Sequence, residues 1–170
     1  FVTPGNEPTI DGNTFTYPNQ DTYTQGSAPA DATSEGWYKA GTCTDGDQRL
    51  NYTQNRICWN AWRANADGKT LAVATDLTGL PSGYYKVAGD LITQPSYVND
   101  QHVFGTSSLQ SANSASLTEG LWSDDGNGTW TTLVSDKVLV HDGKLTIGAS
   151  GTLANQNQSG WFCATNFKLY

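Results

Sequence analysis

The 170-residue chain carries few charged side chains, 15% of the total, and its formal net charge is −7 at pH 7. Nucleic acids and anionic membranes attract proteins mainly through clustered lysines and arginines, so this acidic balance disfavours both as partners. The sequence has no stretch of 18 apolar residues, so we expect no membrane insertion. Most of its polarity comes from Thr, Asn, Ser, Gln and Gly, which favour strands and turns over helices.

The length is compatible with a single domain, because all-β sandwiches often reach this size as one unit. We therefore expect residues 1–170 to form one monomeric domain. The chain begins at Phe1 and contains no Met. It is either a processed mature protein or a domain excised from a larger one, and we favour the excised domain.

In chain order, the first fifty residues are rich in Pro, Gly, Asp and Asn, which predicts long loops with short strands. From Arg56 onward the pattern indicates strands separated by the turn sequences ADGK, GLPSG, DDGNG and HDGK. The segment 107–121 is the longest helix candidate, but its Ser, Asn and Gly content favours a loop. The predicted strands are RICWNAW, KTLAVATDL, GYYKVAGDLI, GTWTTLV, KVLV, GKLTIGAS and WFCATNFKLY. Their number and spacing predict an all-β, jelly-roll sandwich of two antiparallel sheets.

Alternation within two of these strands predicts which side chains face the core. In KTLAVATDL, Leu71, Val73 and Leu77 share the core face, whereas Ala72, Ala74 and Asp76 share a wet or lightly covered face. In GYYKVAGDLI, the same parity places Tyr85, Val87 and Leu91 inside and Tyr84, Lys86 and Asp90 outside, and Ile92 breaks the pattern.

Three cysteines, Cys43, Cys58 and Cys163, cannot all pair within one chain. A Cys43–Cys58 bridge closing the polar loop between them is the pairing we expect if one forms, and three unpaired buried thiols are the alternative. Cys163 lies in the apolar terminal strand, where a free cysteine behaves as a small hydrophobic residue.

Four segments, DLTGLPSGYYKVAG, LTEGLW, KVLVHDGKLTIG and GWFCATNFKLY, occur in this order. As a set they resemble the galactose-binding-like β-sandwich modules of glycan-degrading and surface proteins of Bacteroidetes, over about residues 56–170. The resemblance implies a non-catalytic carbohydrate-binding module that is secreted or displayed on the cell surface and covalently linked to a glycoside hydrolase. It does not name the glycan.

One departure from that family concerns calcium. The family has an acidic residue where this chain has Thr165, and a neutral threonine lacks the charge that Ca²⁺ prefers. Asp11, Asn13 or backbone oxygens are the remaining candidate ligands for a structural calcium. We expect no required cofactor.

Catalysis has little support in the sequence. The two histidines, His102 and His141, lie in a polar loop and a turn, and no nucleophile-elbow motif accompanies them. Glycoside hydrolysis needs two carboxylates that face each other across a cleft. The candidates are Glu119, Asp124 and Asp125 beside Trp122, which also suit a solvated loop or polar contacts to a ligand. We expect a non-enzyme and keep a small glycosidase as a minor alternative.

Sugar binding needs a flat aromatic side chain under the C–H face of a pyranose and amide, carboxylate or guanidinium groups around its hydroxyls. In RICWNAWR, Ile57, Trp59 and Ala61 share one face, so a regular strand exposes Trp62 on the other. Trp62, with Asn60 and Arg63 beside it, is our first candidate platform. The alternative is that Trp62 covers a sheet edge and Arg63 pairs with an acid. Trp37 we assign to the core.

The closing strand GWFCATNFKLY allows two arrangements. Strict alternation buries Trp161 on the same face as Phe167, whereas a β-bulge at Thr165 or Asn166 buries Phe162 and exposes Trp161. On the second arrangement Trp161 lies near the amides Gln156 and Asn157, whose other interpretation is a solvated hairpin tip.

The sequence thus predicts a carbohydrate-binding module for a plant cell-wall polysaccharide such as xylan, β-glucan or glucomannan. An adhesion or spacer sandwich that binds no glycan is the second hypothesis. The predicted ligand-binding residues are Trp62, Trp161, Asn60, Arg63, Trp122, Gln156 and Asn157.

Overall fold

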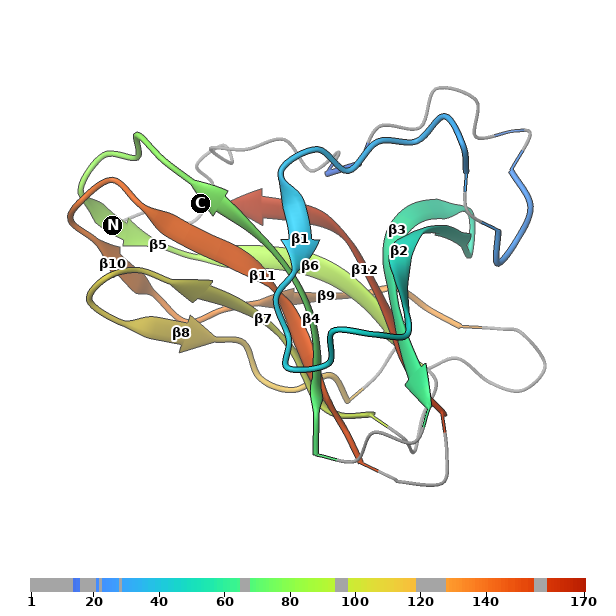
Figure 1. The fold of residues 1–170 in the computed structure, drawn as a ribbon. Coiled ribbons are helices and arrows are strands. Elements are labelled where there is room, and N and C mark those ends of the chain that lie inside the picture. The colour runs from blue at the N-terminus through green and yellow to red at the C-terminus, as the bar shows by residue number, and fades with distance from the viewer. Residues whose placement is uncertain are drawn as a thin grey trace.

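The computed structural model describes residues 14–15, 21, 23–27, 29–64, 68–93, 98–118, 128–154 and 159–170. This part of the chain forms β-strands joined by turns and loops (Figure 1). The strands are β1 (Trp37–Lys39), β2 (Asp47–Thr53), β3 (Arg56–Ala64), β4 (Thr70–Leu77), β5 (Gly83–Tyr85), β6 (Val87–Thr93), β7 (Val98–Thr106), β8 (Ser111–Asn113), β9 (Thr131–Val134), β10 (Val138–Val140), β11 (Leu145–Leu153) and β12 (Ser159–Leu169). Within these ranges no helix is long and apolar enough to cross a lipid bilayer.

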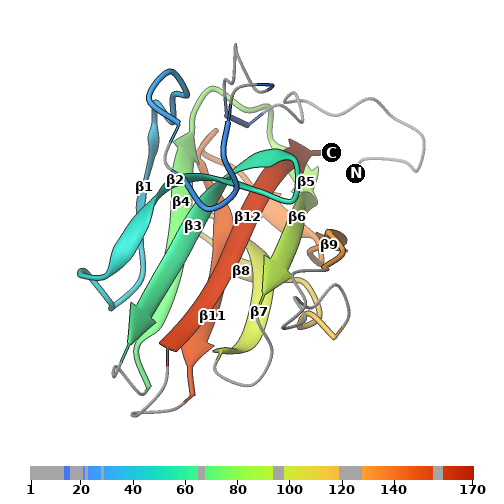
Figure 2. The ribbon, with the colours of Figure 1, turned by 90° about the vertical axis from the view of Figure 1, so that its right-hand side faces the viewer.

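Two five-stranded antiparallel sheets pack face to face (Figure 2). One has the order β1-β4-β11-β7-β8 and the other β2-β3-β12-β6-β9, while β10 and β5 form a short separate ribbon. We call the second one the β12 sheet, since β12 is its central strand. The predicted all-β sandwich of two antiparallel sheets is confirmed.

The core lies between the two sheets and follows the predicted alternation. On β3, Ile57, Trp59 and Ala61 are buried in it, and Leu71 and Val73 of β4 meet them from the facing sheet. Trp37, which the sequence assigned to the core, is partly buried and packs against it, with its ring centroid 4.7 Å from that of Phe167. Burial of these large apolar side chains is the main stabilising term of the fold.

Two expectations about strand faces need correction. Ala72 and Ala74 are buried, although they lie on the outer face of β4, because this strand is flanked on both sides and Tyr38 stands directly opposite Ala74. Asp90 is on the outer face of β6 as predicted, yet it is only 4% exposed, because partners from three other strands surround its carboxylate. The other assignments in GYYKVAGDLI hold, and the segment divides at Lys86 into β5 and β6.

Of the two cysteine arrangements that the sequence left open, the structure has the second, since all three thiols are free and buried. Cys43 lies in the main core between the sheets, whereas Cys58 points to the outer face of the β12 sheet. A disulfide cannot join two thiols on opposite faces of a sheet. Cys58 instead packs against Cys163 and Ile92 in a second, smaller apolar cluster.

Candidate functional site

A β-bulge in β12 determines which of its aromatic side chains reach the surface. The register with β6 shifts between Thr165 and Lys168, and Asn166 has a φ of 55°. Because such a bulge inserts one extra residue, the residues beyond it point to the opposite face from the one that regular alternation predicts. Phe162 and Phe167 therefore both lie in the core, and Trp161 points outward. This is the second of the two arrangements that the sequence allowed.

Side chains from neighbouring strands hold the bulge. Asn166 donates from Nδ2 to Oδ2 of Asp90 at 2.8 Å, and Asp90 also accepts bonds from Arg56 Nη1 and Thr132 Oγ1, each at 2.5 Å. Thr165 donates from Oγ1 to the carbonyl of Ile57 at 2.8 Å. Charge-assisted bonds to a buried carboxylate are among the stronger hydrogen bonds in proteins, so this network fixes the register of β12.

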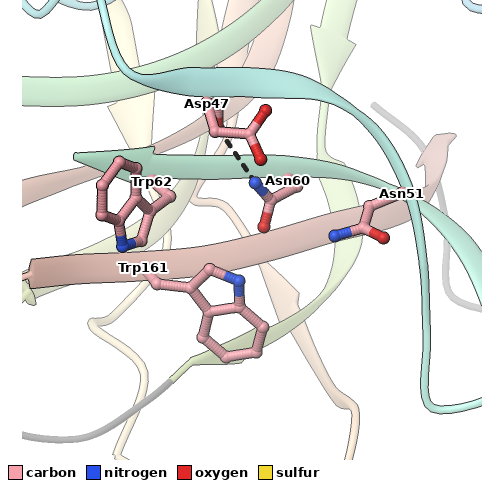
Figure 3. A pocket seen from close by; sticks show the side chains of 5 residues that line it. All are labelled: Asp47, Asn51, Asn60, Trp62 and Trp161. Carbon is pink, nitrogen blue, oxygen red and sulfur yellow. Dashed lines mark hydrogen bonds between the residues drawn. The ribbon is translucent and has the colours of Figure 1, made fainter. Parts of the chain in front are cut away.

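The register then places two tryptophans side by side. Trp161 of β12 stands directly opposite Trp62 of β3, and Trp62 stands directly opposite Asp47 of β2. These three residues form one row across the outer face of the β12 sheet. Together with Asn60 and Asn51 they line an open pocket of about 380 Å³ (Figure 3).

The polar groups of the pocket are held in place by the protein. Asn60 is 2% exposed and donates from Nδ2 to the carbonyl of Asp47 at 2.9 Å. Asn51 uses its Oδ1 to accept a bond from the backbone of Tyr52 at 2.7 Å, which turns its Nδ2 toward the pocket (Figure 3). The carboxylate of Asp47 pairs with Arg49 at 2.5 Å. The pocket thus presents fixed amide groups and a charge-balanced carboxylate beside two indole rings.

The surface beneath Trp161 is apolar. It is the cluster of Cys58, Ile92 and Cys163, all with no exposed surface, against which Trp161 and Trp130 pack. Burial raises the pKa of the Cys163 thiol well above its usual range, and the neighbouring Cys58 adds to that rise. The Cys163 thiol is therefore neutral and contributes surface for packing, not a nucleophile or a thiolate ligand.

The structure brings together three of the predicted ligand-binding residues, namely Trp62, Trp161 and Asn60. Arg63 is not among them. Its neighbour Trp62 faces outward, so alternation turns Arg63 away, and its guanidinium forms a two-bond ion pair with Asp45, with both N···O distances 3.0 Å. This is the alternative that the sequence left open for Arg63. The pair also lowers the pKa of Asp45, chiefly through the hydrogen bond from Arg63.

The remaining predicted residues lie outside the described part of the chain. These are the ligand candidates Trp122, Gln156 and Asn157, the acids Glu119, Asp124 and Asp125, and the calcium candidates Asp11 and Asn13. Among the described residues, no group of three or more His, Cys, Asp or Glu side chains is placed to hold a metal ion.

Sequence reasoning missed Asp47 and Asn51, although a signal was present. Gln54 and Asn55 both have positive φ and connect β2 to β3 in a two-residue hairpin turn, and Asn is one of the residues that tolerates this conformation. The length of that turn fixes the register of the hairpin. It sets Asp47 opposite Trp62 and places Asn51 on the same face.

Comparison with known proteins gives likeness at the level of the fold. No family model matches the chain, and no curated protein matches it. The structure of TmCBM61 in complex with β-1,4-galactotriose is similar with a TM-score of 0.54 and 14% identity, over 80% of this chain and 88% of that one.

Two further solved structures show a similar likeness. A structure from a study of promiscuous specificity among carbohydrate-binding modules of the β-sandwich superfamily has a TM-score of 0.51 and 9% identity, over 86% of this chain and 63% of that one. The arabinose-bound α-L-arabinofuranosidase MgGH51 has a TM-score of 0.52 and 9% identity, over 88% of this chain but only 25% of the enzyme. The chain therefore has the β-sandwich fold found in carbohydrate-binding modules.

Proposed function

We propose that the chain is a non-catalytic carbohydrate-binding module that holds a neutral polysaccharide in the pocket of Trp62 and Trp161. One observation carries this proposal. Two indoles stand directly opposite each other on adjacent strands, and their pocket is lined by two asparagines and an aspartate whose positions are fixed by hydrogen bonds or an ion pair.

This arrangement fits the chemistry of a sugar ring. The C–H face of a pyranose is apolar and packs on a flat aromatic, while its hydroxyls both donate and accept hydrogen bonds. Asn51 supplies a donor and Asp47 supplies acceptors at the pocket. Because the protein already orders these groups, a ligand does not have to order them on binding, which favours affinity from a small contact area.

The fold comparison guides the choice of ligand. TmCBM61 was solved with β-1,4-galactotriose, so we add β-1,4-galactan to xylan, β-glucan and glucomannan as candidate polysaccharides. We further propose that the module is secreted or exposed at the cell surface and directs an attached glycoside hydrolase to its substrate.

The described acids favour binding over hydrolysis. Asp47 is the one carboxylate among the described residues lining the pocket, and it is paired with Arg49. Asp90, on the same sheet face, is buried and accepts three hydrogen bonds. Glycosidases need two carboxylates across a cleft, one of them able to give up a proton.

A spacer domain without glycan binding is the second candidate. The observation that favours it is the contact of Trp161 with the buried cluster of Cys58, Ile92 and Cys163. On that hypothesis the indole covers an apolar patch and has no other role.

Affinity electrophoresis of the domain separates these functions. Native gels contain β-1,4-galactan, xylan, mixed-linkage β-glucan, glucomannan or pectin, with and without calcium. We expect retardation by at least one polymer, and Trp62→Ala and Trp161→Ala to weaken it by roughly tenfold or more, since about 1.4 kcal/mol of lost contact corresponds to tenfold in affinity.

Tyr84→Ala is the matched control, because Tyr84 is an exposed aromatic on β5, outside the β12 sheet. Circular dichroism and thermal unfolding confirm that each variant is folded. Migration unaffected by every polymer contradicts the proposal and favours the spacer, and release of reducing sugar from any of them favours the glycosidase.

A further inference from the structure

The outer face of the β12 sheet continues beyond the pocket to a third tryptophan. Trp130 precedes β9 and packs against the same buried cluster of Cys58, Ile92 and Cys163 that Trp161 contacts. The indoles of Trp161 and Trp130 thus border one apolar patch from two sides. The strand β6 lies between β12 and β9, which separates these strands by about 10 Å.

Arg56 completes this part of the face. Its guanidinium carbon lies 5.2 Å from the centroid of the Trp130 ring, and its Nη1 donates to Asp90 at 2.5 Å. The indole nitrogen of Trp130 lies 3.4 Å from the carbonyl of Gln54, to which it donates. A guanidinium stacked on an indole and paired with a buried carboxylate has a fixed plane.

Arg56 also retains donors for a ligand. A guanidinium carries five N–H groups, and its side chain is 42% exposed although it is paired with Asp90. A fixed planar fork of donors can bond two neighbouring hydroxyl oxygens of a sugar at once. The cluster of Arg56 and Trp130 therefore offers the same combination as the pocket, an aromatic surface beside oriented polar groups.

The spacing of the two clusters sets the length of ligand that reaches both. Arg56 and Trp62 lie on the same face of β3, six residues apart, which corresponds to about 20 Å along a strand. One or two sugar rings do not span that distance, so a ligand that stacks on Trp62 and also contacts Arg56 has several consecutive sugars.

We propose that Arg56 and Trp130 form a second contact zone for the same glycan, so that the module binds several consecutive sugars of a polysaccharide chain. This inference rests on the proposed function. It adds residues at the far side of the sheet face and a length requirement for the ligand.

Calorimetric titration with oligosaccharides of increasing length tests the inference. The probes are the di-, tri-, tetra- and hexasaccharides of β-1,4-galactan, xylan and mixed-linkage β-glucan. For the wild-type domain we expect affinity to rise by tenfold or more from disaccharide to hexasaccharide. In Arg56→Lys and Trp130→Leu we expect this rise to shrink to less than threefold, while affinity for the disaccharide stays within twofold.

These two variants are chosen to preserve the fold. Lysine keeps the charge opposite Asp90 but loses the planar fork, and leucine keeps an apolar cover over the cluster but loses the ring. Tyr84→Ala is again the control for an aromatic off this face. Urea unfolding midpoints within the range of the control show that the variants remain folded.

Nuclear magnetic resonance of the wild-type indole N–H groups gives a second measurement that requires no substitution. The Trp130 signal is expected to move with the hexasaccharide and to stay in place with the disaccharide, whereas the Trp62 signal moves with both. An unchanged length dependence in both variants, together with a stationary Trp130 signal, overturns the second zone and leaves the proposed function intact. Absence of binding to every probe overturns both.

Discussion

Replacing Asn166 tests whether the bulge in β12 is stabilised as the structure indicates. Asn166→Val places a β-branched residue at a φ of 55°, which costs roughly 1–2 kcal/mol. It also removes the bond to Asp90, worth about 1.5 kcal/mol for a charged acceptor and a half-exposed donor. The expected loss in the free energy of unfolding is therefore about 3 kcal/mol.

Asn166→Gly separates the loss of the hydrogen bond from the backbone strain. Glycine adopts positive φ without strain, so only the bond to Asp90 is lost and we expect a cost of about 1.5 kcal/mol. The measurement is urea unfolding followed by tryptophan fluorescence, with equal m-values as the sign that only stability has changed. For a domain of this size, the valine variant is expected to melt roughly 6–12 °C lower than the wild type.

The result that would refute this reasoning is a valine variant as stable as the glycine variant, because backbone strain at position 166 would then contribute nothing. A glycine variant as stable as the wild type would show that the hydrogen bond from Asn166 to Asp90 does not stabilise the bulge.

Two further predictions concern groups away from the sugar pocket. Cys43, Cys58 and Cys163 are buried and free, so a thiol reagent at pH 8 should label none of them in the folded domain and all of them in guanidinium; fewer labelled thiols after unfolding would reveal a disulfide. The pKa of Asp45 is held below its usual range mainly by the hydrogen bond from Arg63. The contribution of this pair to stability is therefore present above the unfolded-state pKa and lost as pH falls through the lower folded-state value. Arg63→Gln should raise the Asp45 pKa measured by nuclear magnetic resonance titration toward about 3.9, and an unchanged pKa would contradict the role of Arg63.

Alternation within single strands predicted the faces of β3 correctly and reduced β12 to two alternatives. This worked because a strand has a period of two, so Trp59 and Trp62 cannot share a face of a regular strand. The same rule required a bulge if Phe162 and Phe167 were both to be buried. The bulge itself depends on Asp90, which lies 76 residues from Asn166 in the sequence.

The features that the sequence missed or left open share a physical cause. The burial of Asp90, the ion pair of Arg63 and the position of Cys58 each depend on neighbours supplied by other strands. Local pattern gives the face of a strand on which a side chain lies, but it does not give what covers that face. The β2–β3 hairpin differs, because its register is fixed by a two-residue turn that lies within the local sequence.

The position of Asp90 links the scaffold of this domain to its proposed binding face. The carboxylate bonds to Asn166, which sets the parity of β12 and so exposes Trp161, and it bonds to Arg56, which lies against Trp130. One buried group therefore orients elements of both proposed contact zones. An ion pair between a buried carboxylate and a partly exposed arginine contributes little net stability compared with apolar packing. The presence of Asp90 on the outer face of the sheet is better explained by its effect on the positions of Trp161 and Trp130.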